Sequence, residues 1–259
     1  MKTEILGKGK PYLTFVVGVH GNEQAPIRGI ELLKKYLQKV KFLKGFKVIY
    51  ANSKAIGSNK RFIDKDLNRS FPGKAKGSYE RKLAYRLTEE LKNGNYTFDF
   101  HSTLIATPPY GVIAIFNQEI KKILTITGIA NYIFNKNESL IKHSPNSVAF
   151  EVGQENDPNS AVTTFHIMKN ILNGLKIIAI PDGIKKAKKI NIFLVYNEIN
   201  RKVAPKLDKK IKDFKFVKGG SIVGYKKNGI PTIAHESFYP IFTKSKNRLV
   251  MSKKIKFLE

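Results

Sequence analysis

The sequence predicts an α/β protein, with a mainly parallel mixed sheet covered by helices on both faces. Tyr12 to Val19 is a nearly continuous apolar run, which is typical of a strand buried on both faces of a parallel sheet. Strand-like and helical patterns then alternate, as expected when crossover helices connect parallel strands. Short β-like segments near the C-terminus add a small β-rich appendage to this fold.

The first predicted strand leads directly into a helix. Asn22 is expected to cap that helix, Pro26 fits its first turn, and Ile30, Leu33 and Leu37 recur at helical spacing. Residues 46–51 form the next predicted strand. The polar segment 52–77 that follows shows no convincing periodicity, and loops of this length are often functional.

Two more helices and three more strands complete the predicted α/β unit. Leucines at positions 83, 87 and 91 give the helix 79–91 an apolar stripe, and Gly94 stops it. Asp157 as cap, Pro158 at the first position and Gly174 at the exit predict a helix over 157–174. The three strands are predicted at residues 96–100, 111–116 and 147–152.

The alternation of predicted strands and helices ends at about residue 183. A lysine run precedes short β-like segments at 190–196, 215–217, 221–225 and 232–234, which glycine-containing turns separate. We therefore predict a catalytic domain over residues 1–184 and a β-rich C-terminal domain over residues 185–259.

Composition limits the possible classes of protein. Hydrophobic residues make up 42% and charged residues 26% of the 259 residues, as in ordinary globular proteins. No apolar run reaches the length of a membrane span, and residues 1–10 lack the pattern of a secretory signal, so a cytoplasmic location and no membrane partner are expected. Because there is no cysteine, any metal site must use imidazole and carboxylate.

The formal net charge of +27 raises the question of a polyanion partner. The basic residues are mostly lysines scattered through every segment, without an arginine-rich stripe or interleaved aromatic residues. Nucleic acid is therefore not the expected partner. Such a charge should still attract small anionic substrates at low ionic strength. The oligomeric state is not predicted.

Metal-binding residue types stand at the ends of two predicted strands. His20 and Glu23 form an H-x-x-E pair where the first strand passes into its helix, and His101 ends another strand. Open α/β sheets bind ligands beyond the carboxyl ends of their strands. Two histidines and one glutamate suit one divalent ion with a coordination position left for water.

Two other features could serve such a site. Arg61, Asn68 and Arg69 lie in the long polar loop, and they could bind an anionic substrate or simply pair with neighbouring aspartates. Glu151 is a carboxylate inside an apolar strand, where a raised pKa would suit a general base, although a structural ion pair is the alternative.

Together these segments resemble the aspartoacylase and succinylglutamate desuccinylase family, which is related to zinc carboxypeptidases. The resemblance covers roughly residues 12 to 175. The stretches that carry it, in matching order and approximate spacing, are residues 18–23 (GVHGNE), 66–71 (DLNRSF), 98–103 (FDFHST) and 150–153 (FEVG). It implies a zinc carboxypeptidase-like fold and hydrolysis of a linear amide C–N bond in an N-acyl amino acid.

The resemblance also implies a role for each matching residue. One zinc ion per chain would be held by His20, Glu23 and His101. Glu151 would be the catalytic base, and Arg61 would polarise the substrate carbonyl. Asn68 and Arg69 would bind the substrate carboxylate.

The chain departs from the family at two places. A further arginine upstream of the catalytic glutamate is replaced here by Lys142 or His143, so Lys142 is the candidate for that substrate contact. Tyr239 is the nearest candidate for a family tyrosine from the C-terminal region. His166 and His235 have no partner at a ligand spacing and are expected to be structural.

Two alternative functions remain open at this point. A zinc metallocarboxypeptidase or peptide amidase would use the same metal centre in a more open cleft, and the position of the appendage would distinguish it from a deacylase. A polyanion-binding protein without activity on a hydrolase fold is the alternative from another class.

Overall fold

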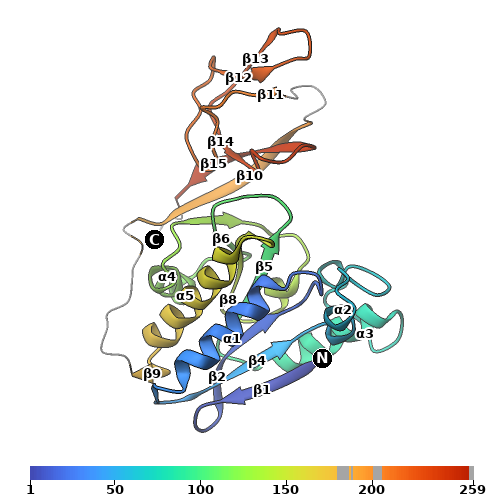
Figure 1. The fold of residues 1–259 in the computed structure, drawn as a ribbon, viewed down its shortest axis with the longest axis vertical. Coiled ribbons are helices and arrows are strands. Elements are labelled where there is room, and N and C mark those ends of the chain that lie inside the picture. Colours follow the sequence, from blue (N-terminus) through green and yellow to red (C-terminus); the bar gives the residue numbers. More distant parts are fainter. Residues whose placement is uncertain (180–186, 188, 201–205, 257–259) are drawn as a thin grey trace.

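The buried strand that the sequence predicts is β2, Pro11–Val17, and it lies inside a ten-stranded sheet. The computed structural model describes residues 1–179, 187, 189–200 and 206–256. The strand order of the large sheet is β1-β4-β2-β5-β8-β6-β7-β10-β15-β14 (Figure 1). The other strands of this sheet are β1 (Lys2–Leu6), β4 (Gly45–Tyr50), β5 (Thr97–Thr103), β6 (Tyr110–Ile113), β7 (Asn131–Phe134), β8 (Ser147–Gln154), β10 (Asn191–Asn200), β14 (Tyr239–Ile241) and β15 (Arg248–Ile255).

The sheet is mixed, with a parallel centre. β4, β2, β5 and β8 run parallel to one another, whereas β6 is antiparallel to β8. β7 is parallel to β6, and β10 is parallel to β7. The predicted α/β fold class with a mainly parallel mixed sheet is confirmed.

Helices cover both faces of the sheet. α1 (Ala25–Leu37) and α5 (Pro158–Gly174) pack side by side on one face, with α3 (Tyr79–Leu91) on the other (Figure 1). Side chains of β2 alternate between the two cores: Phe15 joins the core under α1 and α5, and Val16 joins the core under α3. This alternation explains why the strand is apolar throughout. The remaining helical segments are α2 (Ser53–Gly57), α4 (Gln118–Ile126) and the 3-10 turns Leu67–Arg69 and Leu140–His143.

The start of α1 differs from the prediction. Asn22 does not cap it, because the chain makes a turn there, with Glu23 N donating to His20 O at 3.2 Å. The helix begins at Ala25, whose N–H donates to Glu155 Oε2 at 2.9 Å. A carboxylate from a distant loop therefore caps this helix. The predicted cap of α5 is confirmed, since the Asp157 side chain accepts from Asn159 N.

The C-terminal region continues the large sheet and adds small antiparallel strands. β15 pairs antiparallel with β10 and β14, and β11 (Lys206–Leu207), β12 (Ile222–Tyr225) and β13 (Pro231–Ile233) form a separate antiparallel sheet. Residues 215–217 form no strand, only an isolated bridge from Val217 to Phe238. A two-stranded sheet of β3 (Lys41–Phe42) and β9 (Ile178–Ala179) lies elsewhere. The predicted domain boundary between residues 184 and 185 lies outside the described residues and stays a prediction.

Within the described part of the chain, none of the helices has the length and apolar character needed to cross a membrane.

Candidate active site

The two segments that carry the predicted metal ligands meet at one edge of the sheet. β2 and β5 are parallel neighbours, and their carboxyl ends lie together. His20 and Glu23 stand in the turn between β2 and α1, and His101 lies near the end of β5. Gly18 has a φ of +68°, and a Cβ there would lie 2.4 Å from the Ile56 side chain. The tight turn out of β2 therefore needs glycine at this position.

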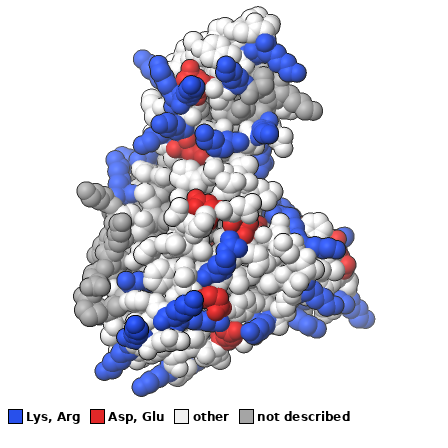
Figure 2. Space-filling view, viewed as in Figure 1, with Lys and Arg blue, Asp and Glu red and all other residues white. Residues whose placement is uncertain are grey.

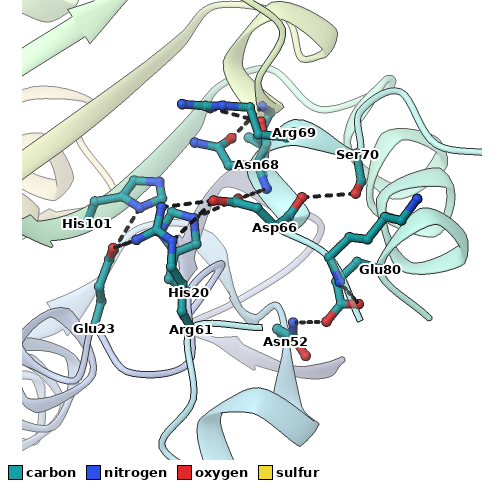
Figure 3. Close-up of polar contacts among 12 residues, drawn as sticks. His20, Glu23, Asn52, Arg61, Asp66, Asn68, Arg69, Ser70, Glu80 and His101 are labelled. Atoms are coloured by element: carbon teal, nitrogen blue, oxygen red, sulfur yellow. Dashed lines mark hydrogen bonds and ion pairs between the residues drawn. The ribbon is translucent and has the colours of Figure 1, made fainter. Parts of the chain in front are cut away.

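His20, Glu23 and His101 form one buried cluster (Figure 3). One ligand atom from each lies within 4.8 Å of the others, and the residues are 4%, 7% and 5% exposed. His20 Nδ1 lies 2.7 Å from Glu23 Oε1, and His101 Nδ1 lies 2.9 Å from Glu23 Oε2. Two segments that are far apart in the sequence thus bring three side chains together at a spacing that suits a single cation.

A second carboxylate holds the other nitrogen of each imidazole. His20 Nε2 lies 3.0 Å from Asp66 Oδ1, and His101 Nε2 lies 2.8 Å from Asp99 Oδ2. Histidines that bind metals commonly have such a partner, which fixes the ring orientation and makes the ligand nitrogen more basic. The sequence predicted neither contact, since it offered Asp66 only as an ion-pair partner of the loop arginines and gave Asp99 no role.

The pKa values of the cluster follow from these contacts. Burial by itself would lower the pKa of His20, but its hydrogen bonds with Asp66 and Glu23 outweigh burial and raise it. Burial would raise the pKa of Glu23, but the two histidines lower it to about 2. Glu23 is therefore a carboxylate at neutral pH, as a metal ligand must be.

The donor set fits a divalent ion such as zinc. Two imidazole nitrogens and a carboxylate are ligands that zinc prefers, and three protein ligands leave a position for water or substrate, as in catalytic sites. The outer carboxylates supply the supporting contacts that such sites usually have. The described residues around the cluster thus have the chemistry of a metal centre.

Glu151 lies on β8, next to the histidine on β5. His101 and Glu151 are register partners in the parallel pair. Glu151 Oε2 is buried and has no hydrogen-bond partner among the described residues. Burial, more than any neighbouring charge, raises the pKa of Glu151 to about 8. A carboxylate of this kind is suited to exchange a proton near neutral pH.

The long loop brings its arginines to the same place (Figure 3). Arg61 donates to Asp66 Oδ2 through Nε at 3.1 Å and Nη2 at 3.0 Å, and Nη1 lies 3.4 Å from Glu23 Oε1. Asn68 Oδ1 accepts from Leu140 N at 3.3 Å. The Arg61 side chain is 42% exposed, so its guanidinium remains accessible beside the cluster.

A cavity of about 830 Å³ opens beside the cluster. Its lining combines His101, Glu151, Asn68 and Arg69 with an apolar wall from β6, β7 and the C-terminal strands β10 and β15, whereas Arg61 is not among the lining residues. Lining residues include Asn68, Arg69, His101, Glu151, Val112, Ile133, Leu194, Val195, Glu198, Arg248 and Val250. The C-terminal region thus forms part of the cavity wall.

Lys142 and Tyr239 are not among the residues that line this cavity. Lys142 forms an ion pair with Glu138. Tyr239 lies on β14, with its ring against Phe193 and Phe216. Their assignments as substrate contacts stay predictions.

The comparisons with known proteins agree on one family. Residues 10–138 match the succinylglutamate desuccinylase/aspartoacylase catalytic domain. A probable aspartoacylase from Acaryochloris marina is 28% identical over 240 residues, which cover 83% of this chain and 72% of that relative.

Solved structures show the same fold. A succinylglutamate desuccinylase/aspartoacylase from Rhodobacter sphaeroides gives a TM-score of 0.75 at 15% identity, covering 98% of this chain and 89% of the other. Murine aminoacylase 3 gives a TM-score of 0.66 at 18% identity, covering 96% of this chain and 97% of the other. The chain therefore carries a catalytic domain of the succinylglutamate desuccinylase and aspartoacylase family, a family of amide hydrolases.

Proposed function

We propose that the protein is a zinc-dependent amidohydrolase that removes the acyl group from an N-acyl amino acid. The observation that carries the proposal is the meeting of His20, Glu23 and His101 beside a cavity that Glu151 also lines. The family match supports hydrolysis of an amide, and this geometry supports a metal-assisted route.

Each protein group has a separate part in the proposed reaction. A zinc ion held by the two histidines and Glu23 would supply Lewis acidity toward the amide carbonyl and the attacking water. Glu151 takes a proton from that water and passes it to the leaving amine. Its raised pKa suits both transfers, since the group must accept a proton and release it again.

Two groups bind the substrate through its charges. The Arg61 guanidinium, beside the cluster, stabilises the negative charge that develops on the carbonyl oxygen. Asn68 and Arg69 line the cavity and bind the α-carboxylate of the amino acid, since arginine can pair with a carboxylate through two parallel hydrogen bonds. The products are a free amino acid and a carboxylic acid.

The C-terminal strands favour small substrates over peptides. Residues of β10 and β15 line the cavity together with Glu151, so the C-terminal region borders the site and limits the space open to a long substrate. This observation supports a deacylase rather than a carboxypeptidase or peptide amidase.

The test combines metal analysis with a substrate panel. Purified protein should contain about one zinc per chain, as sites with this donor set do. It should hydrolyse one or more of the N-acetyl, N-succinyl and N-formyl amino acids faster than short peptides, and a chelator should abolish the activity. Absence of bound metal would remove the metal-assisted route, and faster cleavage of peptides would favour the peptidase alternative.

A further inference from the structure

Glu80 is a buried carboxylate that the proposed reaction does not use. It lies in the first turn of α3 and is 0% exposed. Its Oε1 accepts from Ile63 N at 2.7 Å and Asn52 Nδ2 at 3.0 Å, and its Oε2 accepts from Asp64 N at 3.0 Å and Lys65 N at 3.1 Å (Figure 3). Three consecutive backbone N–H groups of the long loop therefore point at one side chain.

These hydrogen bonds compensate the charge of Glu80. Burial would raise the pKa of Glu80, but the bonds from the backbone of residues 63–65 and from Asn52 outweigh it and lower the pKa. Burying an ionised carboxylate is unfavourable unless it is fully hydrogen-bonded. The four donors around Glu80 meet that requirement, and the same bonds fix the conformation of the loop.

The loop also holds the helix in return. Asp64 Oδ2 accepts from Tyr79 N at 2.7 Å at the N-terminus of α3, where Ser78 makes no side-chain cap. Loop and helix thus satisfy each other's backbone donors. Asn52 extends the connection, since its own N–H donates to Gly18 O at 3.0 Å, two residues before His20.

The segment held by Glu80 continues directly into the functional part of the loop. Lys65 is followed by Asp66, whose Oδ1 lies 3.0 Å from His20 Nε2 and accepts from Asn68 N at 2.9 Å. The 3-10 turn Leu67–Arg69 follows at once and presents Asn68 and Arg69 to the cavity. A shift of residues 63–65 would therefore move the proposed carboxylate-binding pair.

We propose that Glu80 is a positioning residue for substrate binding, acting through the backbone of residues 63–65 to place Asn68 and Arg69. This inference rests on the proposed function, because it assigns those two residues to the substrate carboxylate. Glu80 itself touches neither the substrate nor the metal ligands.

The test compares Glu80→Gln with Glu89→Gln, the same substitution at an exposed position of α3. Glutamine at position 80 keeps the size of the side chain but turns an NH₂ group toward backbone donors, so part of the loop loses its acceptor. Three quantities are measured for each protein: zinc content, hydrogen exchange of the amides of residues 63–65, and kcat and KM for an N-acyl amino acid and for its neutral carboxamide.

Glu80→Gln should speed exchange at residues 63–65, and the purified protein should still contain about one zinc per chain, because His20, Glu23 and His101 are all retained. It should also reduce the preference for the carboxylate substrate over the carboxamide by about ten- to a hundredfold, mostly through KM, because a misplacement of about 1 Å can have an effect of this order. Arg69→Ala should lose the same preference, and Glu80→Gln combined with Arg69→Ala should lose little more. Glu89→Gln should behave as the wild type.

Other outcomes overturn the inference. An unchanged preference in Glu80→Gln, with or without faster exchange, shows that Glu80 does not position the pair. Should Glu80→Gln fail to fold, Glu80→Asp is measured instead, since aspartate keeps the charge but is one methylene shorter. Glu80→Asp must then show a smaller loss of the preference for the carboxylate substrate, or the inference fails. If the wild type hydrolyses no N-acyl amino acid, the proposed function fails separately, and the exchange measurement, which needs no substrate, still decides whether Glu80 holds the loop.

Discussion

At the scale of single residues, the histidines of the site are distinguished by having a carboxylate at both ring nitrogens. Glu23 lies between the two Nδ1 atoms, while Asp66 and Asp99 hold the Nε2 atoms. A buried structural histidine needs only one such partner. The additional carboxylates are therefore better explained by the need to orient ligands around a cation.

Asp99→Asn should weaken metal binding because it removes the charge behind His101. Asp99 is 1% exposed and lies 2.8 Å from His101 Nε2, so water cannot replace the carboxylate as the partner of that nitrogen. The dissociation constant for zinc should rise about 10- to 100-fold. Competition with a chromophoric chelator measures it. The control is Asp157→Asn, which changes an exposed helix cap and none of the carboxylates that contact the two histidines. Equal affinity in both variants would contradict the assigned role of Asp99.

Glu151→Gln should abolish most of the turnover while leaving the metal in place. Glutamine has nearly the same shape but cannot accept the proton, and general acid–base catalysis typically contributes about 10²- to 10⁴-fold. We expect kcat to fall by that order with zinc content unchanged. Glu198→Gln alters another carboxylate that lines the cavity and should have a much smaller effect. Comparable losses in the two variants would argue against a specific role for Glu151 as the base.

At the scale of elements, the contact between residues 63–65 and Glu80 of α3 makes the free energy of unfolding depend on pH. The pKa of Glu80 is lower in the folded protein than its ordinary value of 4.5, so the folded state binds this proton less tightly than the unfolded chain. The stabilisation from Glu80 is therefore complete above about pH 4.5 and is lost as the pH falls toward the folded pKa.

Urea unfolding of the metal-free protein measures this effect. Glu80→Gln should be less stable than the wild type by on the order of 2 kcal/mol at pH 7, as expected for lost hydrogen bonds to a buried charge. The difference should shrink as the pH falls below about 4.5, the ordinary pKa of the carboxyl group. A difference that stays constant with pH would mean that the charge of Glu80 is not what stabilises the junction.

The elements that carry the site could be predicted because their signals are local. The apolar run of β2 and the leucine stripe of α3 identify those elements from consecutive residues, and His20 and His101 follow from the strands that lead to them. Asp99 could also have been found, since a residue two positions before His101 on a strand lies on the same face. Asp66, the partner of His20, lies 46 residues further along the chain in a loop, so no local pattern indicates that pairing.

The rest of the site depends on contacts that leave no local pattern. Glu80 recognises backbone N–H groups 15 to 17 residues away, and backbone donors are the same in every sequence. The cap of α1 comes from Glu155, 130 residues from Ala25, so the local candidate Asn22 was the wrong choice. β7 and β14 are too short for their periodicity to be read. A strand was predicted at residues 190–196, but its pairing with β7 and β15 could not be. The contribution of β10 and β15 to the cavity wall is therefore known only from the fold.

At the scale of the whole molecule, the positive charge is spread rather than concentrated. Lysine and arginine side chains appear over both the α/β part and the C-terminal strands, with acidic residues among them (Figure 2). The formal net charge is +27. A distributed charge of this size produces a long-range field that attracts any small anion, and salt screens it over a Debye length of about 10 Å at 0.1 M.

The rate of hydrolysis should therefore depend on salt in a way that follows the charge of the substrate. For an N-acyl amino acid with a free carboxylate, kcat/KM should fall several-fold when sodium chloride is raised from about 0.01 to about 0.3 M. The change should lie mainly in KM. For the neutral carboxamide it should stay nearly constant, because no net charge is attracted. A parallel decrease for both substrates would point to an effect of salt on the protein itself. Equal insensitivity of both would show that the field of the whole molecule does not contribute to substrate binding.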